Sequence, residues 1–461
     1  MASSKKPLLL VSSTPVYGHF MPIKGIAKEL LSRGYEITFV TGSPYRQQLE
    51  DMGCSFVSLE GDGDQTEKDI NNYPERKGLT GVEGFIFDMI NFFIKWIPSQ
   101  HEAQQKALQK LTSEHPGRPI IAINEGFFLG AIPALLNAPG FKADASINIG
   151  IVPITLSSID TAPFGSGLPP NSTPEGRIAN AAASEDFQQV IAPITNAFRE
   201  TIKQCGAKHQ VAGFFDATFL HPDCFLQMCI PSVEYPRSDA PSHIKFAGGL
   251  PKGNRPPYAD APVWWATDIL ANETKKIVLV SQGTIAMNPN ELMVPTMLGL
   301  ASYPDFLVVV ALGVKGATLP EGTVIPENAR VADYIPFDEL LPHCSAFVTN
   351  GGYGAFQHSV SNGIPLVLAG ATEDKPEVSA RAEWAGIGIN MKTASPSAEA
   401  IAEAVKTIVS DGKFKRRALE LQSEMKEHDP MSIIAATIEE LAAGLSKKAI
   451  DLRSDFYQNV L

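Results

Sequence analysis

The sequence is poor in cysteine. Its 461 residues include 5 cysteines, at positions 54, 205, 224, 229 and 344. They lie far apart, are odd in number and form no Cys-x-x-Cys pair, which argues against a disulfide framework and a cysteine-ligated zinc site. We therefore expect a protein of a reducing compartment, the cytoplasm.

Long apolar runs are also lacking. A transmembrane helix needs about 18 or more consecutive apolar residues, whereas the richest stretch, residues 85–97, is interrupted by polar residues at 88, 91 and 95. The apolar run at residues 8–11 is too short for the core of a signal peptide. The sequence therefore predicts no stable membrane insertion.

Positive charge is scarce. The chain has 38 Lys and Arg residues against 50 Asp and Glu residues, and its formal net charge is -12. The acidic excess is spread along the chain, which disfavours binding to nucleic acid or to an anionic membrane. Any phosphate must therefore be bound by local groups. Because no Asp and His residues cluster at metal-ligand spacing, we expect no metal.

What the sequence does contain is an alternation of short apolar runs with helical segments, which predicts βα units and mostly parallel sheets. A chain of 461 residues exceeds what one hydrophobic core usually organises. We therefore predict an α/β fold with two Rossmann-like domains whose parallel sheets face a central cleft. The predicted strands are residues 8–11, 37–40, 55–59, 120–123 and 145–149, then 277–280, 306–311, 331–334, 346–349 and 365–368.

Pro and Gly punctuate a polar stretch between the two series of strands, as in linkers between domains. We place the N-terminal domain at 1–245, the linker at 246–265 and the C-terminal domain at 266–445.

A histidine follows the first predicted strand. The loop after residues 8–11 carries His19 beyond the carboxyl end of that strand, where open α/β sheets bind their ligands. The pKa of imidazole lies near neutrality, so His19 suits a general base that takes a proton from an attacking hydroxyl. The alternative is a histidine that caps the helix or fills a crevice.

An acid follows another predicted strand, residues 120–123. A histidine base needs an acceptor that fixes its tautomer, and we choose Glu125 for this role, with Asn124 in reserve. Alternatively, Glu125 is an acid at a helix N-terminus, where the helix dipole favours it.

A glycine-rich turn, residues 350–354, separates a predicted strand from a helix. Glycines allow close approach of the backbone to a ligand, and the N–H groups of a helix start bind anionic oxygens. Residues 281–284 form a second polar loop, and Asp374 follows another strand, where a carboxylate can hold vicinal sugar hydroxyls. Each feature has an ordinary alternative, a tight strand–helix junction or a solvated surface charge.

Taken together, these motifs resemble the family of UDP-dependent glycosyltransferases that act on lipophilic small molecules, especially its bacterial macrolide and fungal branches. Residues 18–22 are similar to the catalytic histidine loop of the family, and residues 334–375 are similar to its donor-binding signature. The resemblance implies the two-domain GT-B fold and inverting transfer of a hexose, by default glucose, from a UDP-sugar to an acceptor hydroxyl. We expect no cofactor or metal besides this co-substrate.

The resemblance also assigns roles to residues. His19 would be the base, and Glu125 would take the place of the usual aspartate. Ile335 would contact uracil through its backbone, and His358 would occupy the ribose position. Lys375 stands where a glutamine is usual, which leaves the identity of the hexose open. The expected donor-binding residues are Gly283, Thr284, Ile335, Asn350, Gly352, Gly354, Ala355, His358, Asp374 and Lys375.

Aromatic residues are candidates for an apolar acceptor pocket above His19. They are Phe85, Phe87, Phe92 and Phe127, together with Phe93, Trp96 and Phe128. The spacing in residues 85–97 fits equally well an amphipathic helix turned into the core. In the family, the C-terminal segment returns to the N-terminal domain, and we expect residues 446–461 to form such a helix.

Two other functions use the same motifs. A nucleotide-sugar epimerase on this scaffold would release a changed sugar nucleotide without any acceptor. A non-catalytic auxiliary protein of a transferase would lack a usable base, whereas His19 and its loop are present here.

Overall fold

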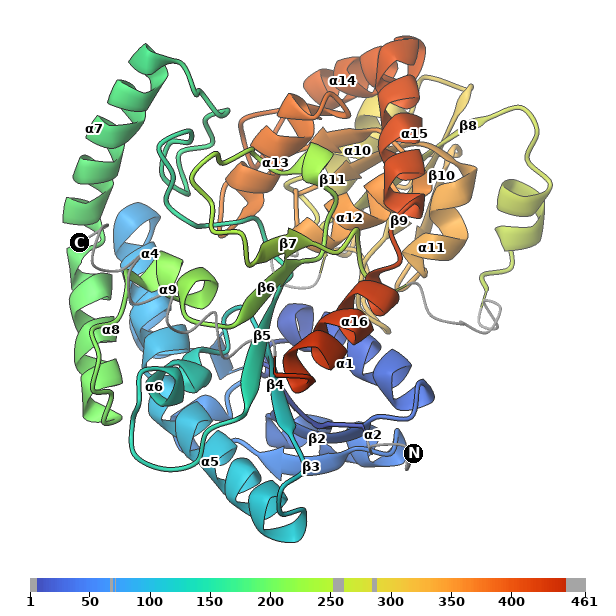
Figure 1. Ribbon diagram of the computed structural model, residues 1–461. Coiled ribbons are helices and arrows are strands. Elements are labelled where there is room, and N and C mark those ends of the chain that lie inside the picture. Colours follow the sequence, from blue (N-terminus) through green and yellow to red (C-terminus); the bar gives the residue numbers. More distant parts are fainter. Residues whose placement is uncertain (1–5, 67–68, 71, 252–260, 284–287, 445–461) are drawn as a thin grey trace.

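Figure 1 shows the chain as a computed structural model, which describes residues 6–66, 69–70, 72–251, 261–283 and 288–444. Two separate parallel sheets with helices packed against them form two lobes. The α/β prediction is therefore confirmed.

The first sheet has seven strands in the order β3-β2-β1-β4-β5-β6-β7, and all neighbouring pairs are parallel. Every residue of β1, β4 and β5 is buried, as expected of strands covered on both faces. Alternate residues of β1 pack into the cores on opposite faces of the sheet. The strands are β1 Leu8–Ser12, β2 Glu36–Thr41, β3 Ser55–Ser58, β4 Ile120–Glu125, β5 Ala145–Gly150, β6 Cys224–Gln227 and β7 Ile244–Phe246.

The second sheet has six strands in the order β10-β9-β8-β11-β12-β13, again all parallel. In both sheets the strand order reverses beside the first strand, so loops that follow neighbouring strands open a crevice at the carboxyl edge. The strands are β8 Lys276–Ser281, β9 Phe306–Ala311, β10 Ala329–Ala332, β11 Cys344–Thr349, β12 Leu366–Leu368 and β13 Gly388–Asn390.

Helices cover both sheets. Those that follow strands of the first sheet are α1 Tyr17–Ser32, α2 Arg46–Asp51, α4 Gly81–Met89, α5 Ile97–Glu114, α6 Ile132–Leu135, α7 Pro174–Val190, α8 Ala192–Gln204 and α9 Phe214–Leu220. The helices that come after β8 in the chain are α10 Met293–Leu300, α11 Phe337–Leu340, α12 Tyr353–Asn362, α13 Lys375–Trp384, α14 Ala398–Ser410, α15 Gly412–Lys426 and α16 Pro430–Ala442. A π-helical turn, Ile90–Ile94, separates α4 from α5.

The last described helix, α16, corrects the predicted assignment of residues up to 445 to the C-terminal domain. Its residues Met431, Ile434 and Ile438 are buried in the core of the first sheet, and Figure 1 shows the helix in red beside α1. The amphipathic spacing of these residues predicts a buried face, but not which sheet it covers. The predicted returning segment, 446–461, lies outside the described residues.

The chain passes from one sheet to the other between β7 and β8, an interval that contains most of the predicted linker, 246–265. Residues 252–260 of this linker lie outside the described part of the chain. We use "first lobe" for β1 to β7 with their helices and α16, and "second lobe" for β8 to α15.

Candidate active site

A large cleft lies between the two lobes, and both contribute to its walls. Its cavity volume is about 2230 Å³, well above the roughly 300–1,000 Å³ of a typical site for one small molecule. The cleft therefore has room for two reactants at once.

His19 lies on the cleft wall of the first lobe, in the first turn of α1. Its side chain is 17% exposed, and its Nδ1 atom lies 3.0 Å from Oε1 of Glu125. Because Nδ1 faces a carboxylate, the neutral ring has its proton on Nδ1 and its lone pair on Nε2. This arrangement prepares Nε2 to accept a proton.

Glu125, the last residue of β4, is fully buried behind His19. Two hydrogen bonds fix its carboxylate. The hydroxyl of Thr14 donates to Oε2 at 3.2 Å, and the backbone N–H of Phe127 donates to Oε1 at 2.8 Å. These hydrogen bonds hold the acid in place to orient the imidazole.

Asn124, the reserve candidate, does not lie beside His19. Successive residues of a strand point to opposite faces, and the Asn124 amide joins a different buried group. Its Oδ1 accepts a hydrogen bond from Gln104 at 2.7 Å, and its Nδ2 donates to Asn148 at 3.3 Å.

The glycine turn after β11 opens onto the cleft from the second lobe. Gly351 has φ +86°, and a Cβ atom there would lie 2.8 Å from the Ser379 hydroxyl oxygen, so only glycine fits. Helix α12 then begins at Tyr353, with Gly352 as its N-cap residue and no side-chain cap. Gly352, Gly354 and Ala355 all line the cleft. Uncapped N–H groups and the helix dipole make this an anion-binding surface.

The amide of Asn350 takes part in this turn in a way that the sequence did not indicate. Asn350 is 6% exposed and lines the cleft, but its Nδ2 donates to the backbone carbonyl of Gln282 at 2.5 Å. It therefore ties the end of β11 to the end of β8. Gly283 also lines the cleft, while Thr284 lies outside the described residues.

His358, on α12, lines the same wall and pairs with an acid that was not predicted. Its Nδ1 lies 2.8 Å from Oδ1 of Asp338. The only sequence signal for Asp338 is its place within the donor-like segment. The Ile335 side chain is 2% exposed and packs into the second-lobe core instead of lining the cleft. The expected contact of its backbone with uracil stays a prediction.

Asp374 and Lys375 lie at the start of α13 and also line the cleft. Burial raises the pKa of Asp374 to about 6, although the positive charge of His19 opposes this rise. Asp374 and His19 line the same cleft from opposite lobes. Burial lowers the pKa of Lys375 to about 8. Its ammonium contacts the Glu373 carboxylate and donates to the Thr372 hydroxyl at 3.2 Å.

The predicted aromatic residues divide into two groups. Phe85, Phe92 and Phe127 line the cleft, as does Phe93. Phe87 instead packs against its neighbours Tyr73 and Phe92, so its expected place in the acceptor wall is corrected. Trp96 and Phe128 are fully buried, at 0% and 1% exposure, and belong to the cores.

Two aromatic rings pack beside the imidazole. The Phe127 ring meets His19 edge-on with centroids 5.8 Å apart, and the Phe93 ring lies 6.2 Å from it. The π-helical turn, Ile90–Ile94, carries Phe93 to this position. The surroundings of the candidate base are therefore apolar on the first-lobe side.

Within the described residues, no group of three or more His, Cys, Asp or Glu side chains is arranged to hold a metal ion. None of the described helices has the length and apolar character needed to cross a membrane. All five cysteines are free thiols.

Comparisons with known proteins connect this geometry to one family. Residues 297–441 match the model of the C-terminal domain of erythromycin biosynthesis protein CIII-like proteins. The chain is 38% identical over 444 residues to UDP-glucosyltransferase A1 of Starmerella bombicola, which covers 96% of this chain and 94% of that protein. It is 39% identical over 450 residues to UDP-glycosyltransferase 2 of Phaeomoniella chlamydospora, covering 96% of this chain and 97% of the relative.

The fold is similar to that of solved structures. The crystal structure of the glycotransferase of kitacinnamycin superposes with a TM-score of 0.67, at 20% identity, over 95% of this chain and 100% of that chain. At this level of identity the likeness establishes the shared fold.

Proposed function

This chain belongs to the family of UDP-dependent glycosyltransferases, and we propose that it is an inverting enzyme that moves a hexose, by default glucose, to a hydroxyl of a small lipophilic acceptor. Its fold is the GT-B fold, and glycosyl transfer from a UDP-sugar is the activity of the family. The acceptor class, the catalytic base and the stereochemistry are what we propose.

The observation that carries the proposal is the pairing of His19 with Glu125 opposite the glycine turn. The 3.0 Å contact between Nδ1 and the carboxylate supports a base whose Nε2 accepts the proton of the acceptor hydroxyl. Asp374 lines the same cleft from the second lobe. A sugar held by Asp374 would thus share the cleft with an acceptor activated by His19.

In the proposed reaction, the acceptor oxygen attacks the anomeric carbon as its proton moves to His19. The bond from the anomeric carbon to the diphosphate breaks, and UDP leaves with the bonding electron pair. The uncapped start of α12 offers N–H groups to the negative charge that develops on the diphosphate. This local stabilisation supports a reaction without a metal ion.

The apolar rings around His19 support a lipophilic acceptor. Phe93 and Phe127 contact the imidazole, and they and Phe85 line the cleft on the first-lobe side. An acceptor gains free energy there by burying apolar area while its hydroxyl meets the base. The five free thiols are in keeping with a cytoplasmic enzyme, which is part of the proposal.

The experiment is incubation of the purified chain with UDP-glucose and a panel of phenolic, polyketide, sterol and macrolide acceptors. Mass spectrometry detects hexosylated products, and proton NMR gives their anomeric configuration. We expect a β-glycoside and stoichiometric release of UDP. An α-glycoside would contradict the inverting mechanism, and a changed sugar nucleotide formed without acceptor would indicate an epimerase instead.

A further inference from the structure

Four charged side chains are buried together where the lobes meet: Glu234, Arg237, Glu377 and Arg381, here called the junction network. Glu234 and Arg237 follow β6 in the first lobe, and Glu377 and Arg381 belong to α13 in the second. Arg381 and Glu234 are 1% and 0% exposed. Because desolvated charges are costly unless paired, such a group persists only with well-defined geometry.

Arg381 connects the lobes through two carboxylates. Its Nε and Nη2 lie 2.8 Å and 2.7 Å from Oε1 of Glu234, in the other lobe. Its Nη1 lies 2.7 Å from Oε2 of Glu377, one turn earlier on α13. Burial disfavours the charged form of Glu234, but Arg381 and Arg237 outweigh this effect and lower its pKa.

Glu377 makes a second connection between the lobes. Its Oε1 accepts hydrogen bonds from the backbone N–H groups of Gly165 and Gly167, both at 2.8 Å. These glycines have φ +94° and +62°, a left-handed conformation that directs both amides to one oxygen. Gly165 lies on the cleft wall of the first lobe, so Glu377 ties the donor-side helix to the acceptor-side loop.

The anchored helix carries the residue expected to hold the sugar. Asp374 is the N-cap residue of α13, three residues before Glu377. The neighbouring donor-side helix is also tied across the junction, because Gln227 at the end of β6 donates to the hydroxyl of Tyr353 at 2.9 Å. The starts of α12 and α13, which line the cleft, are therefore attached to the first lobe by polar contacts.

We propose that Arg381 and Glu377 are positioning residues for the transfer, which hold α13, and with it Asp374, at a set distance from His19. This inference rests on the proposed function. Displacement of reacting groups by about 1 Å can lower a rate about 100-fold. Arg381 and Glu377 thus act on the transfer step, while the glycine turn proposed to bind the diphosphate lies in the second lobe.

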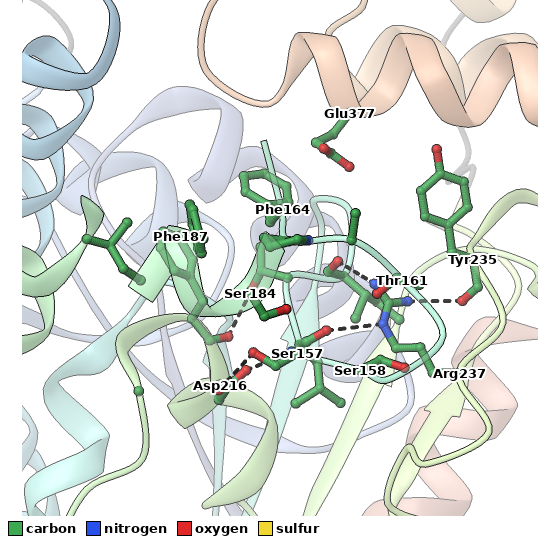
Figure 2. A pocket seen from close by; sticks show the side chains of 18 of the residues that line it. Ser157, Ser158, Thr161, Phe164, Ser184, Phe187, Asp216, Tyr235, Arg237 and Glu377 are labelled. Carbon is green, nitrogen blue, oxygen red and sulfur yellow. Dashed lines mark hydrogen bonds between the residues drawn. The ribbon is translucent and has the colours of Figure 1, made fainter. Parts of the chain in front are cut away.

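Arg237 offers a matched control. It approaches Glu234 at 3.4 Å, but it is anchored to the first lobe by backbone carbonyls of Ile154, Leu156 and Tyr235. Figure 2 shows the Arg237 side chain hydrogen-bonded to Tyr235 in a pocket that Glu377 also lines. A change at Arg237 disturbs the same buried charges without removing a contact between the lobes.

The test compares Arg381→Lys, Glu377→Gln and Arg237→Lys with the wild-type chain. Lysine at position 381 keeps the positive charge but lacks the forked guanidinium group that contacts two carboxylates. Calorimetric titration with UDP gives the folded fraction and the affinity for UDP. Kinetics with UDP-glucose and an acceptor then give kcat per folded molecule, and UDP release in excess of glycoside measures donor lost to water.

We expect Arg381→Lys and Glu377→Gln to lower kcat about 10- to 100-fold, to leave the affinity for UDP unchanged and to raise the share of donor hydrolysed. Arg237→Lys should lower the thermal unfolding midpoint but retain wild-type kcat per folded molecule. If Arg381→Lys does not fold, Glu377→Gln decides the question.

Wild-type kcat and hydrolysis ratio in Glu377→Gln would overturn the inference, and so would an equal loss of kcat in Arg237→Lys. Both comparisons are made against a wild-type chain that transfers sugar. Absence of transfer by the wild type itself would refute the proposed function instead.

Discussion

Replacement of Glu125 by Gln tests the electrostatic part of the mechanism with little change of shape. The glutamine oxygen can accept the Phe127 N–H and the His19 Nδ1–H, and its NH₂ group can donate to the Thr14 hydroxyl. The three contacts of the wild-type carboxylate thus keep a partner, with the direction of the Thr14 hydrogen bond reversed. The substitution removes a negative charge with little change of shape.

The expected size of the effect follows from the 3.0 Å contact between Nδ1 and Oε1. Both charges are delocalised, so their centres lie roughly 4 Å apart, where two unit charges interact by about 4 kcal/mol at an effective dielectric constant of about 20. With the proton about half transferred at the transition state, about 2 kcal/mol is lost. We therefore expect kcat to fall about 30-fold.

The assay is steady-state transfer from UDP-glucose, with KM for the donor measured alongside kcat. Since Glu125 is buried behind His19 and does not line the cleft, KM for UDP-glucose should not change. Thr14→Val is the control, because it removes one hydrogen bond to the carboxylate but keeps the charge, and its kcat should fall only a few-fold. A Glu125→Gln enzyme with kcat within about 2-fold of wild type would refute the reasoning. A 2-fold change corresponds to an increase of about 0.4 kcal/mol in the activation free energy, far below the expected loss of about 2 kcal/mol.

Two further predictions concern the walls of the cleft. The pKa of Asp374 is raised to about 6, and only the ionised carboxylate accepts pairs of hydrogen bonds from sugar hydroxyls. KM for UDP-glucose should therefore rise as the pH falls through about 6, and Asp374→Asn should remove this dependence; a pH-independent wild-type KM would contradict it. Phe127→Ala should raise KM for an apolar acceptor about 10-fold, because the lost burial of apolar area costs about 1.4 kcal/mol of binding free energy. KM for UDP-glucose serves as the control and should not change.

Much of the fold could be predicted from the sequence because the inner strands are covered on both faces. Their continuous apolar runs identify β1, β4 and β8 within one or two residues. The strands β6, β7 and β13 were not predicted. They have three or four residues each, and a Gln, Lys, Gly or Asn interrupts the apolar run in each of them.

The site was predictable where function depends on a local motif. The histidine loop and the glycine turn are contiguous in sequence, and both line the cleft. Residue pairs that are distant in sequence left no such signal. Arg381 and Glu234 are 147 positions apart, and an arginine on a helix is ordinarily exposed. The return of α16 to the first lobe was missed because an apolar stripe does not identify its partner.

Replacement of His19 by Ala is the most direct test of the central claim, that this imidazole takes the proton of the acceptor. The measurement is kcat for glycoside formation at saturating UDP-glucose, with the affinity for UDP determined on the same preparation. The account predicts that kcat falls about 100-fold or more, while the affinity for UDP stays at the wild-type value because the glycine turn lies in the second lobe. Near-normal kcat in His19→Ala would contradict it.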